Sequence, residues 1–176
     1  MASLMSAAAA GAWPVVAVDP VEPKRQLAPA VGATHACAPE DLDTLMNEIA
    51  PDRFDWAFEA VGSAVVFESA YAITGRGGGT VSVGLPHPAA VLQLPALSIV
   101  AENRRLLGSS MGTAQPAVDI PAMIVLWKAG RLPVDRLVSS VLPLDEINGA
   151  FDELASGRAV RQFVRPGASA ANRAES

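Results

Sequence analysis

Short aliphatic runs of strand length alternate with helical patterns along almost the whole chain, and this alternation limits the possible folds more than any other feature. Runs such as residues 15–18 are continuously apolar, which is typical of strands buried on both faces of a parallel sheet. The alternation therefore predicts a doubly wound α/β fold, a parallel sheet with helices on both faces. Such a sheet normally begins with a strand, but this chain begins with a helical pattern, so we expect the first strand to be missing.

The expected elements follow from apolar periodicity and from capping residues. Strands are expected at residues 15–18, 34–38, 54–60, 80–85, 106–111, 137–142 and 160–164. Helices are expected at residues 2–11, 23–31, 40–49, 63–73, 119–129 and 144–155. Pro29 is expected to shorten or kink its helix, and the glycines of segment 75–79 are expected to form a turn. The apolar segment 92–100 is ambiguous.

Composition and charge exclude several classes of protein. Apolar residues make up 51% of the chain and charged residues 18%, which indicates a packed globular protein. The net charge is -5 and the 13 basic residues are scattered, so the sequence shows no basic patch of the kind that binds nucleic acid. The positive mean hydropathy indicates surface that meets another domain or subunit.

The uncharged opening segment, residues 1–18, raises the question of a membrane or signal segment. A signal peptide would begin with basic residues, and a membrane helix needs about 20 apolar residues without the interruption of Gly11 and Pro14. We therefore expect a cytoplasmic protein that is not inserted in a membrane. Cys37 is the single cysteine, so an internal disulfide is excluded.

The first predicted strand ends on an acid, Asp19, and Lys24 follows five residues later. Nucleotide-binding sheets place their ligand beyond the carboxyl ends of the strands. An acid there accepts hydrogen bonds from both hydroxyls of the adenosine ribose and repels a 2'-phosphate, which selects NAD over NADP. The competing interpretation is that Asp19 caps the next helix and Lys24 is solvated, and these two residues alone slightly favour it.

Six blocks of sequence together resemble one family. They are VVAVDPVEPKRQLAPAVGATH, FDWAFEAVGS, GRGGGTVSVGLP, NRRLLGSSMG, AGRLPVDRLVSSVLPLDEINGAFDELASG and AVRQFV. In this order they resemble the zinc-type alcohol dehydrogenases of the medium-chain dehydrogenase/reductase superfamily, up to about Pro166. One block alone is weak support, whereas six in the family's order are strong.

The resemblance implies a set of residues that contact NAD. Asp19 and Lys24 match the pair that contacts the adenosine ribose, and Val61 and Gly62 match the positions that border the adenosine side. Val83, Gly84 and Leu85, with Ser109 and Met111, match the two main-chain segments that meet the nicotinamide carboxamide. Arg161 matches the arginine that pairs with the pyrophosphate.

Two parts of the family pattern are absent. The G-x-G-x-x-G turn is missing, and the glycines of 75–79 do not replace it because they precede a predicted strand. The family's catalytic zinc needs a cysteine- and histidine-rich lobe that is not present, and His35, Cys37 and His87 cannot build either family zinc site. We therefore assign no catalytic residue and no metal ligand to this chain.

The resemblance implies the organisation and the activity. Residues 1–110 are expected to be a partial dinucleotide-binding domain, 111–166 a segment that packs on the missing catalytic lobe, and 167–176 a disordered tail. The whole enzyme would oxidise an alcohol to an aldehyde or ketone with NAD, and would form a homodimer through residues 94–111. This chain, truncated or read from a late start, is expected to be inactive and weakly stable alone.

Two alternatives remain open. A zinc-free quinone-type reductase of the same superfamily would usually use NADPH and would favour a basic or small residue where Asp19 stands. A non-catalytic nucleotide-binding module could still dimerise through residues 94–111.

Overall fold

The structure is a computed structural model that describes residues 1–167 of the 176-residue chain. All but the first residue of the tail expected at 167–176 lie outside the described residues. The chain divides into two compact units, one formed by Met1–Leu42 with Pro121–Ser176 and the other by Asp43–Ile120. Every strand pairing within residues 1–167 is parallel, which confirms the predicted α/β class.

The first part of the discontinuous unit is a strand–helix–strand arrangement preceded by a helix. Its elements are α1 (Ala2–Ala9), β1 (Val16–Val18), α2 (Glu22–Leu27) and β2 (His35–Cys37). β1 pairs in parallel with β2, with Val16 opposite His35. After α2 the chain tightens into a 3-10 turn at Ala28–Val31, which contains Pro29, and Gly32 ends it at a φ of 108°. The predicted shortening of this helix at Pro29 is confirmed.

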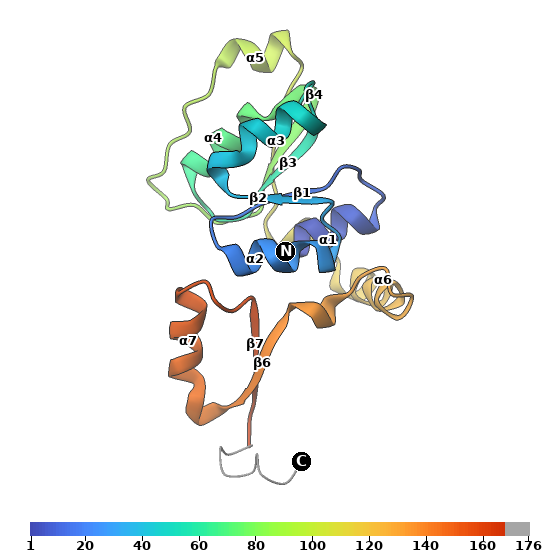
Figure 1. Cartoon of the computed structure of the whole chain (residues 1–176), viewed down its shortest axis with the longest axis vertical. Helices are drawn as coiled ribbons and strands as arrows, with labels where there is room; N and C mark the ends of the chain where they lie inside the picture. Colours follow the sequence, from blue (N-terminus) through green and yellow to red (C-terminus); the bar gives the residue numbers. More distant parts are fainter. Residues whose placement is uncertain (168–176) are drawn as a thin grey trace. The chain divides into compact units, whose positions relative to one another are not determined.

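The second part of this unit contains α6 (Pro116–Lys128), β6 (Val138–Pro143), α7 (Ile147–Ala155) and β7 (Arg161–Arg165). β6 and β7 form a parallel pair, and α7, which connects them, runs beside the pair (Figure 1). Met5 and Val31 from the first part pack with Leu132 and Leu137 from the second in one buried cluster. This cluster holds the two stretches of the unit together.

The continuous unit is built on a three-stranded parallel sheet in the order β3-β4-β5. Its elements are α3 (Leu42–Ile49), β3 (Phe54–Glu59), α4 (Ala64–Ala72), β4 (Thr74–Ser82), α5 (Ala96–Ala101) and β5 (Arg105–Gly108). α4 begins at Ser63, whose hydroxyl accepts a hydrogen bond from the amide of Val66 at 3.5 Å. It packs on β3 and β4, with Phe67 and Tyr71 buried (Figure 1).

The glycine-rich segment 75–79 does not form the expected turn. β4 runs through it and ends at Ser82, three residues before the expected end at residue 85. The register jumps here, because Thr74 lies opposite Phe54 while Gly79 lies opposite Trp56. Glycine permits such an irregularity, and a Cβ on Gly79 would collide with the Trp56 ring. The ambiguous segment 92–100 contains the start of α5.

Within residues 1–167, β1 pairs with β2 alone and β3 pairs with β4 alone, so each is an edge strand of its own sheet.

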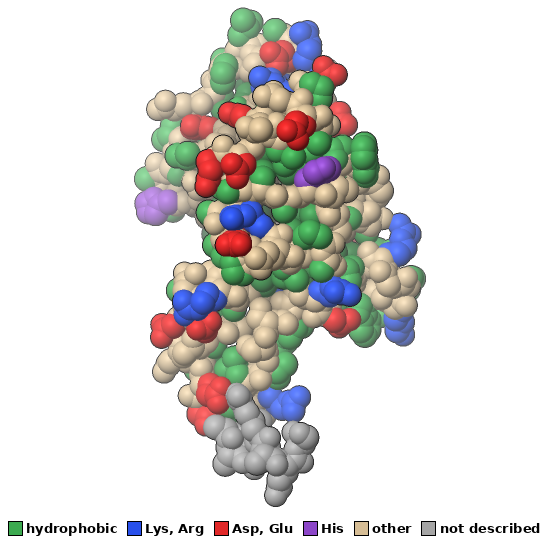
Figure 2. Space-filling view, in the orientation of Figure 1, with side chains coloured by type: hydrophobic (Ala, Val, Ile, Leu, Met, Phe, Trp, Pro, Cys, Tyr) green, Lys and Arg blue, Asp and Glu red, His purple; other side chains and the backbone are tan. Residues whose placement is uncertain are grey.

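Large apolar side chains are exposed at the surface, and apolar side chains cover parts of the visible face (Figure 2). α6 is the clearest example, with exposed Val118, Ile120, Met123, Ile124, Val125 and Trp127. This agrees with the positive mean hydropathy. No helix in residues 1–167 combines the length and apolar character needed to cross a membrane.

Candidate cofactor-binding site

Two of the predicted cofactor segments follow neighbouring parallel strands and contact each other through their main chains. Val61 and Gly62 follow β3, and the segment 83–85 follows β4, so both leave the same edge of the sheet. A Cβ on Gly84 would collide with the amide nitrogen of Gly62, and one on Gly62 would collide with the carbonyl oxygen of Leu85. Gly62 also has a φ of 84°. Glycine is required at both positions because the two backbones approach so closely.

Glu59, the last residue of β3, joins these two segments. Its side chain is buried, and its Oε1 accepts hydrogen bonds from the amides of Val61 and Gly62, each at 2.6 Å, and from that of Ser63 at 3.3 Å. Its Oε2 accepts a hydrogen bond from the hydroxyl of Ser82 at 3.0 Å. Glu59 was not among the residues predicted from the sequence, although an acid near the end of a predicted strand can signal such a site.

The third predicted segment follows β5 and has a strained backbone. The amide of Ser109 donates to the carbonyl of Ser82 at 2.9 Å, so this segment starts beside the end of β4. Met111, Gly112 and Thr113 all have positive φ values of 50–72°. Non-glycine residues adopt this conformation at a cost, and such strain is concentrated at functional sites. The turn ends the strand earlier than predicted, at Gly108.

Asp19 leaves the carboxyl end of β1 and serves as a cap in this structure. Its Oδ1 accepts a hydrogen bond from the amide of Val21, the residue before α2, at 2.9 Å. Arg25 donates to the main-chain carbonyl of Asp19 at 2.8 Å. Within residues 1–167, Oδ2 of Asp19 has no hydrogen-bond partner, so one carboxylate oxygen remains open to a ligand. The capping role and a ligand role are therefore compatible.

Asp19, Lys24 and Arg161 all act electrostatically on the Met1 amino group, which precedes α1. Burial lowers the pKa of the Met1 amino group; Asp19 opposes this shift, whereas Lys24 and Arg161 lower the pKa further. These charges influence one amine because they lie near it. The first amides of α1 are unpaired within the helix and carry the positive end of its dipole. The helix amides and the two cations favour an anion at this end of α1, whereas the carboxylate of Asp19 opposes one.

The predicted residues thus form two groups, one in each unit. Asp19, Lys24 and Arg161 belong to the discontinuous unit, and the main-chain segments at 61–62, 83–85 and 109–111 belong to the continuous unit. The three main-chain segments and Asp19 follow the ends of parallel strands, whereas Lys24 lies on α2 and Arg161 at the start of β7.

The candidate zinc-ligating side chains do not form a metal site. Among residues 1–167, no three His, Cys, Asp or Glu side chains are grouped as a metal ion requires. His35 shares a hydrogen bond with the Thr34 hydroxyl at 2.9 Å, and His87 accepts one from the amide of Ala89 at 3.2 Å. Burial raises the pKa of the Cys37 thiol, which disfavours the thiolate that binds zinc. The residues present do not fit the family's zinc.

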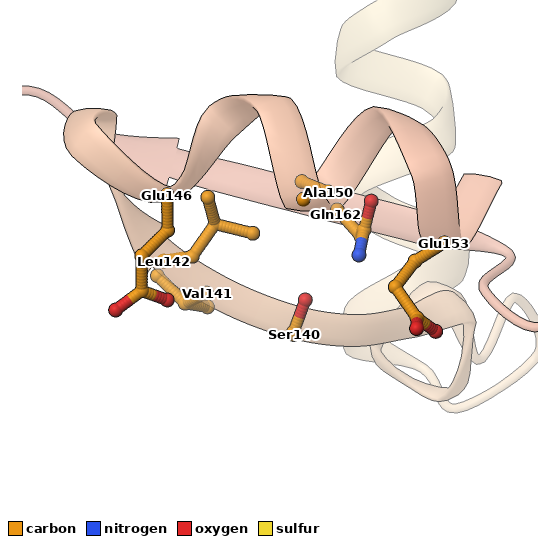
Figure 3. Close-up of a pocket in the computed structure, with 8 residues that line it drawn as sticks. Ser140, Val141, Leu142, Glu146, Ala150, Glu153 and Gln162 are labelled. Carbon is orange, nitrogen blue, oxygen red and sulfur yellow. The ribbon is translucent and has the colours of Figure 1, made fainter.

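A separate cavity of about 480 Å³ lies between β6, β7 and α7 (Figure 3). Ser140 and Gln162 point into it from the strands, while Ala150 and Glu153 approach from α7. Ser140 Oγ and Gln162 Oε1 are buried without a hydrogen-bond partner in the described part of the chain. No predicted cofactor residue lines this cavity.

Comparison with known proteins places the chain in a family. The family model described as zinc-binding dehydrogenase matches residues 1–127, and the chain belongs to this family. It is 33% identical over 167 residues to an NDMA-dependent alcohol dehydrogenase of Amycolatopsis methanolica, covering 92% of this chain and 45% of that protein. The chain thus spans less than half the length of the curated relatives it matches.

Solved structures agree with this assignment. The benzyl alcohol dehydrogenase of Acinetobacter calcoaceticus has a TM-score of 0.88 at 28% identity, covering 94% of this chain and 46% of that chain. A zinc-binding dehydrogenase of Sinorhizobium meliloti 1021, bound to NADP, has a TM-score of 0.72 at 27% identity, covering 93% and 47%. The chain corresponds to the nucleotide-binding region of zinc-type alcohol dehydrogenases.

Proposed function

We propose that this chain is the NAD-binding part of an alcohol dehydrogenase that oxidises an alcohol to an aldehyde or ketone. The observation that carries the proposal is the placement of three main-chain segments at the ends of β3, β4 and β5, with an acid at the end of β1. Ligands of open α/β sheets bind at such strand ends. The alcohol dehydrogenase names of the relatives support the reaction class.

The discontinuous unit would hold the adenosine ribose and the pyrophosphate. Oδ2 of Asp19 is available to a ribose hydroxyl, and the negative charge of this side chain would disfavour the 2'-phosphate of NADP. Lys24 would approach the same ribose. Arg161 and the first amides of α1 would bind the pyrophosphate, because its negative charge is stabilised by both.

The continuous unit would hold the adenosine side and the nicotinamide. Val61 and Gly62 would border the adenosine, while the main chain of 83–85 and of 109–111 would bind the carboxamide. NAD, when bound, supplies the ring that accepts a hydride from the alcohol carbon. The residues of this chain orient that ring. The zinc and the substrate pocket would come from the other half of the whole protein.

The sheet topology supports a partial dinucleotide-binding domain at residues 1–110. Within each unit the strand order, β1-β2 in one and β3-β4-β5 in the other, matches consecutive strands of a doubly wound sheet. Residues 111–166, with the exposed apolar face of α6, would pack on the catalytic lobe.

We further propose a homodimer through residues 94–111. β5 is an edge strand with β4 as its one partner in the described residues, and all four of its residues are exposed. An exposed edge strand is a template for pairing with another chain.

The test is a nuclear magnetic resonance titration of the ¹⁵N-labelled chain with NAD⁺ and with NADP⁺. NAD⁺ is expected to shift the amide signals of Asp19, Gly62, Gly84, Ser109 and Arg161, and NADP⁺ is expected to shift them less. Affinity is expected to be weak because the G-x-G-x-x-G turn is missing. A control variant, Asp43→Asn on α3, should titrate like the original chain.

Two outcomes would contradict the proposal. One is the absence of NAD⁺-induced shifts at these amides. The other is a preference for NADP⁺, which would favour the NADPH-dependent, zinc-free reductase.

A further inference from the structure

Glu59 is a buried charge that the proposed cofactor contacts do not use. It is only 1% exposed at the end of β3. Burial of a carboxylate is unfavourable unless hydrogen bonds replace its lost water. Four groups donate to this carboxylate, the amides of Val61, Gly62 and Ser63 and the hydroxyl of Ser82. Each of these groups donates, and the carboxylate oxygens accept, so the four bonds replace the water that the side chain loses on burial.

The bonds of Glu59 divide between two loops. Oε1 binds the loop after β3, and Oε2 binds Ser82, the last residue of β4. The main-chain carbonyl of Glu59 also accepts a hydrogen bond from the amide of Val83 at 2.8 Å. One residue therefore fixes both loops, and the close approach of Gly62 and Gly84 leaves little freedom for either to move alone.

Capping of α4 does not account for this arrangement. The Ser63 hydroxyl already accepts the amide of Val66 at that helix end. The shortest bonds of Glu59, at 2.6 Å, go to Val61 and Gly62, which precede the helix. The carboxylate is therefore directed mainly at the loop and not at the helix.

We propose that Glu59 is a positioning residue for the dinucleotide. Its carboxylate and carbonyl set the spacing between the main-chain segment assigned to the adenosine side and the segment assigned to the nicotinamide. This inference rests on the proposed function, because that function assigns the two loops to the cofactor. Glu59 acts through these loops and does not itself contact NAD.

Four variants of the whole chain test the inference. Ser82→Ala removes one bond between the carboxylate and β4 while leaving Val61 and Gly62 paired. Glu59→Leu removes every side-chain bond at similar size. Glu59→Gln is the conservative rescue, because its Oε1 accepts the same amides and its amide group donates to Ser82. Glu68→Gln is the matched control, since Glu68 accepts the amide of Gln93 at 2.8 Å in the same unit.

Amide hydrogen exchange without nucleotide is the first measurement. Ser82→Ala should lower protection at Val83 and Gly84 and preserve it at Val61 and Gly62. Glu59→Leu should lower protection at all four amides, while Glu59→Gln should preserve it. If Ser82→Ala leaves Val83 and Gly84 as protected as in the original chain, the coupling of the loops is wrong.

The second measurement is the NAD⁺ titration of the same variants. Glu59→Leu should weaken binding by about tenfold and Ser82→Ala by about threefold, with Glu59→Gln within about twofold of the original chain. The shifts at Gly62 and Gly84 should shrink while those at Asp19 persist, a pattern that a general loss of stability would not give. If Glu59→Leu does not fold, Ser82→Ala and Glu59→Gln carry the test.

The outcomes separate this inference from the proposed function. If the original chain shows no NAD⁺-induced shifts, the proposed function is overturned and the cofactor role of Glu59 with it. If the original chain binds NAD⁺ and Ser82→Ala binds it identically, only the role of Glu59 is overturned. A loss of equal size in Glu68→Gln would also overturn it.

Discussion

At the scale of single residues, Asp19 caps a turn with one carboxylate oxygen and leaves the other for the ligand role that we propose. Its Oδ1 caps the turn into α2, and its Oδ2 is open within residues 1–167. Capping and ligand binding were both predicted from the sequence, as alternatives. Which carboxylate oxygen caps the turn depends on the backbone at Pro20 and Val21, so the sequence alone could not show that the two roles are compatible. The structure removes the conflict between the two interpretations.

Asp19→Asn removes the negative charge of this residue while keeping the oxygen that caps the turn. Asparagine keeps an oxygen for the amide of Val21, so stability should change by less than about 0.5 kcal/mol. The loss of negative charge should raise the affinity for NADP⁺ relative to NAD⁺ by about tenfold. Calorimetric titration with both nucleotides measures this ratio. An unchanged ratio would remove Asp19 from the cofactor assignment.

Cys37 gives a prediction about pH. Burial raises the pKa of its thiol above the ordinary value of 9.0, and Asp41 raises it further. The neutral thiol is thus favoured in the folded state, so this contribution to stability is present below pH 9.0 and is lost as the pH rises above it. Urea unfolding at pH 7 and pH 10 should show a larger loss for the original chain than for Cys37→Ala. Equal losses would contradict this cause.

At the scale of elements, the strand–helix alternation predicted the class and most of the elements, because apolar periodicity is a local property. It failed where long-range contacts decide. The register shift between β3 and β4 lies where the Trp56 ring packs against Gly79, and Met111 and Thr113 adopt a positive φ although neither is glycine. Glu59 was missed although three of its partners, Val61, Gly62 and Ser63, are local in the sequence; only Ser82 comes from a neighbouring strand.

Gly84→Ala tests the contact between the two loops. The added Cβ would collide with the main chain of Gly62, so the free energy of unfolding should fall by about 1–3 kcal/mol. Gly149→Ala in α7 is the control, since nothing lies within 4 Å of its Cβ position, and it should stabilise the helix by about 0.5–1 kcal/mol. Urea denaturation measures both. Equal effects of the two variants would show that the loops are not in close contact.

At the scale of the whole molecule, the exposed apolar surface and the strands with a single partner among residues 1–167 support the proposals that this chain packs on another lobe and on a second copy. The family relatives are more than twice as long as the matched region, and α6 exposes apolar side chains along its length. The sequence predicted this surplus of apolar surface from its hydropathy, but only the structure located it on α6 and β5.

The dimer proposal has a direct test. The chain of 18.2 kDa should sediment at about twice its mass, and Leu107→Lys on β5 should return it to a monomer, because a charge on an edge strand opposes pairing. Leu154→Lys on α7 is the control, with 46% exposure against 44% for Leu107, and should remain dimeric. A monomeric original chain, or dissociation by both variants, would contradict an interface at β5.

A crystal structure of the chain grown with NAD⁺ tests the central claim most directly. The account predicts that the adenosine ribose lies against the carboxylate of Asp19, the pyrophosphate beside Arg161, and the carboxamide on the main chain of Leu85 and Ser109. A nucleotide bound elsewhere, for example in the cavity beside Ser140 and Gln162, would contradict the assignment of these strand ends to the cofactor.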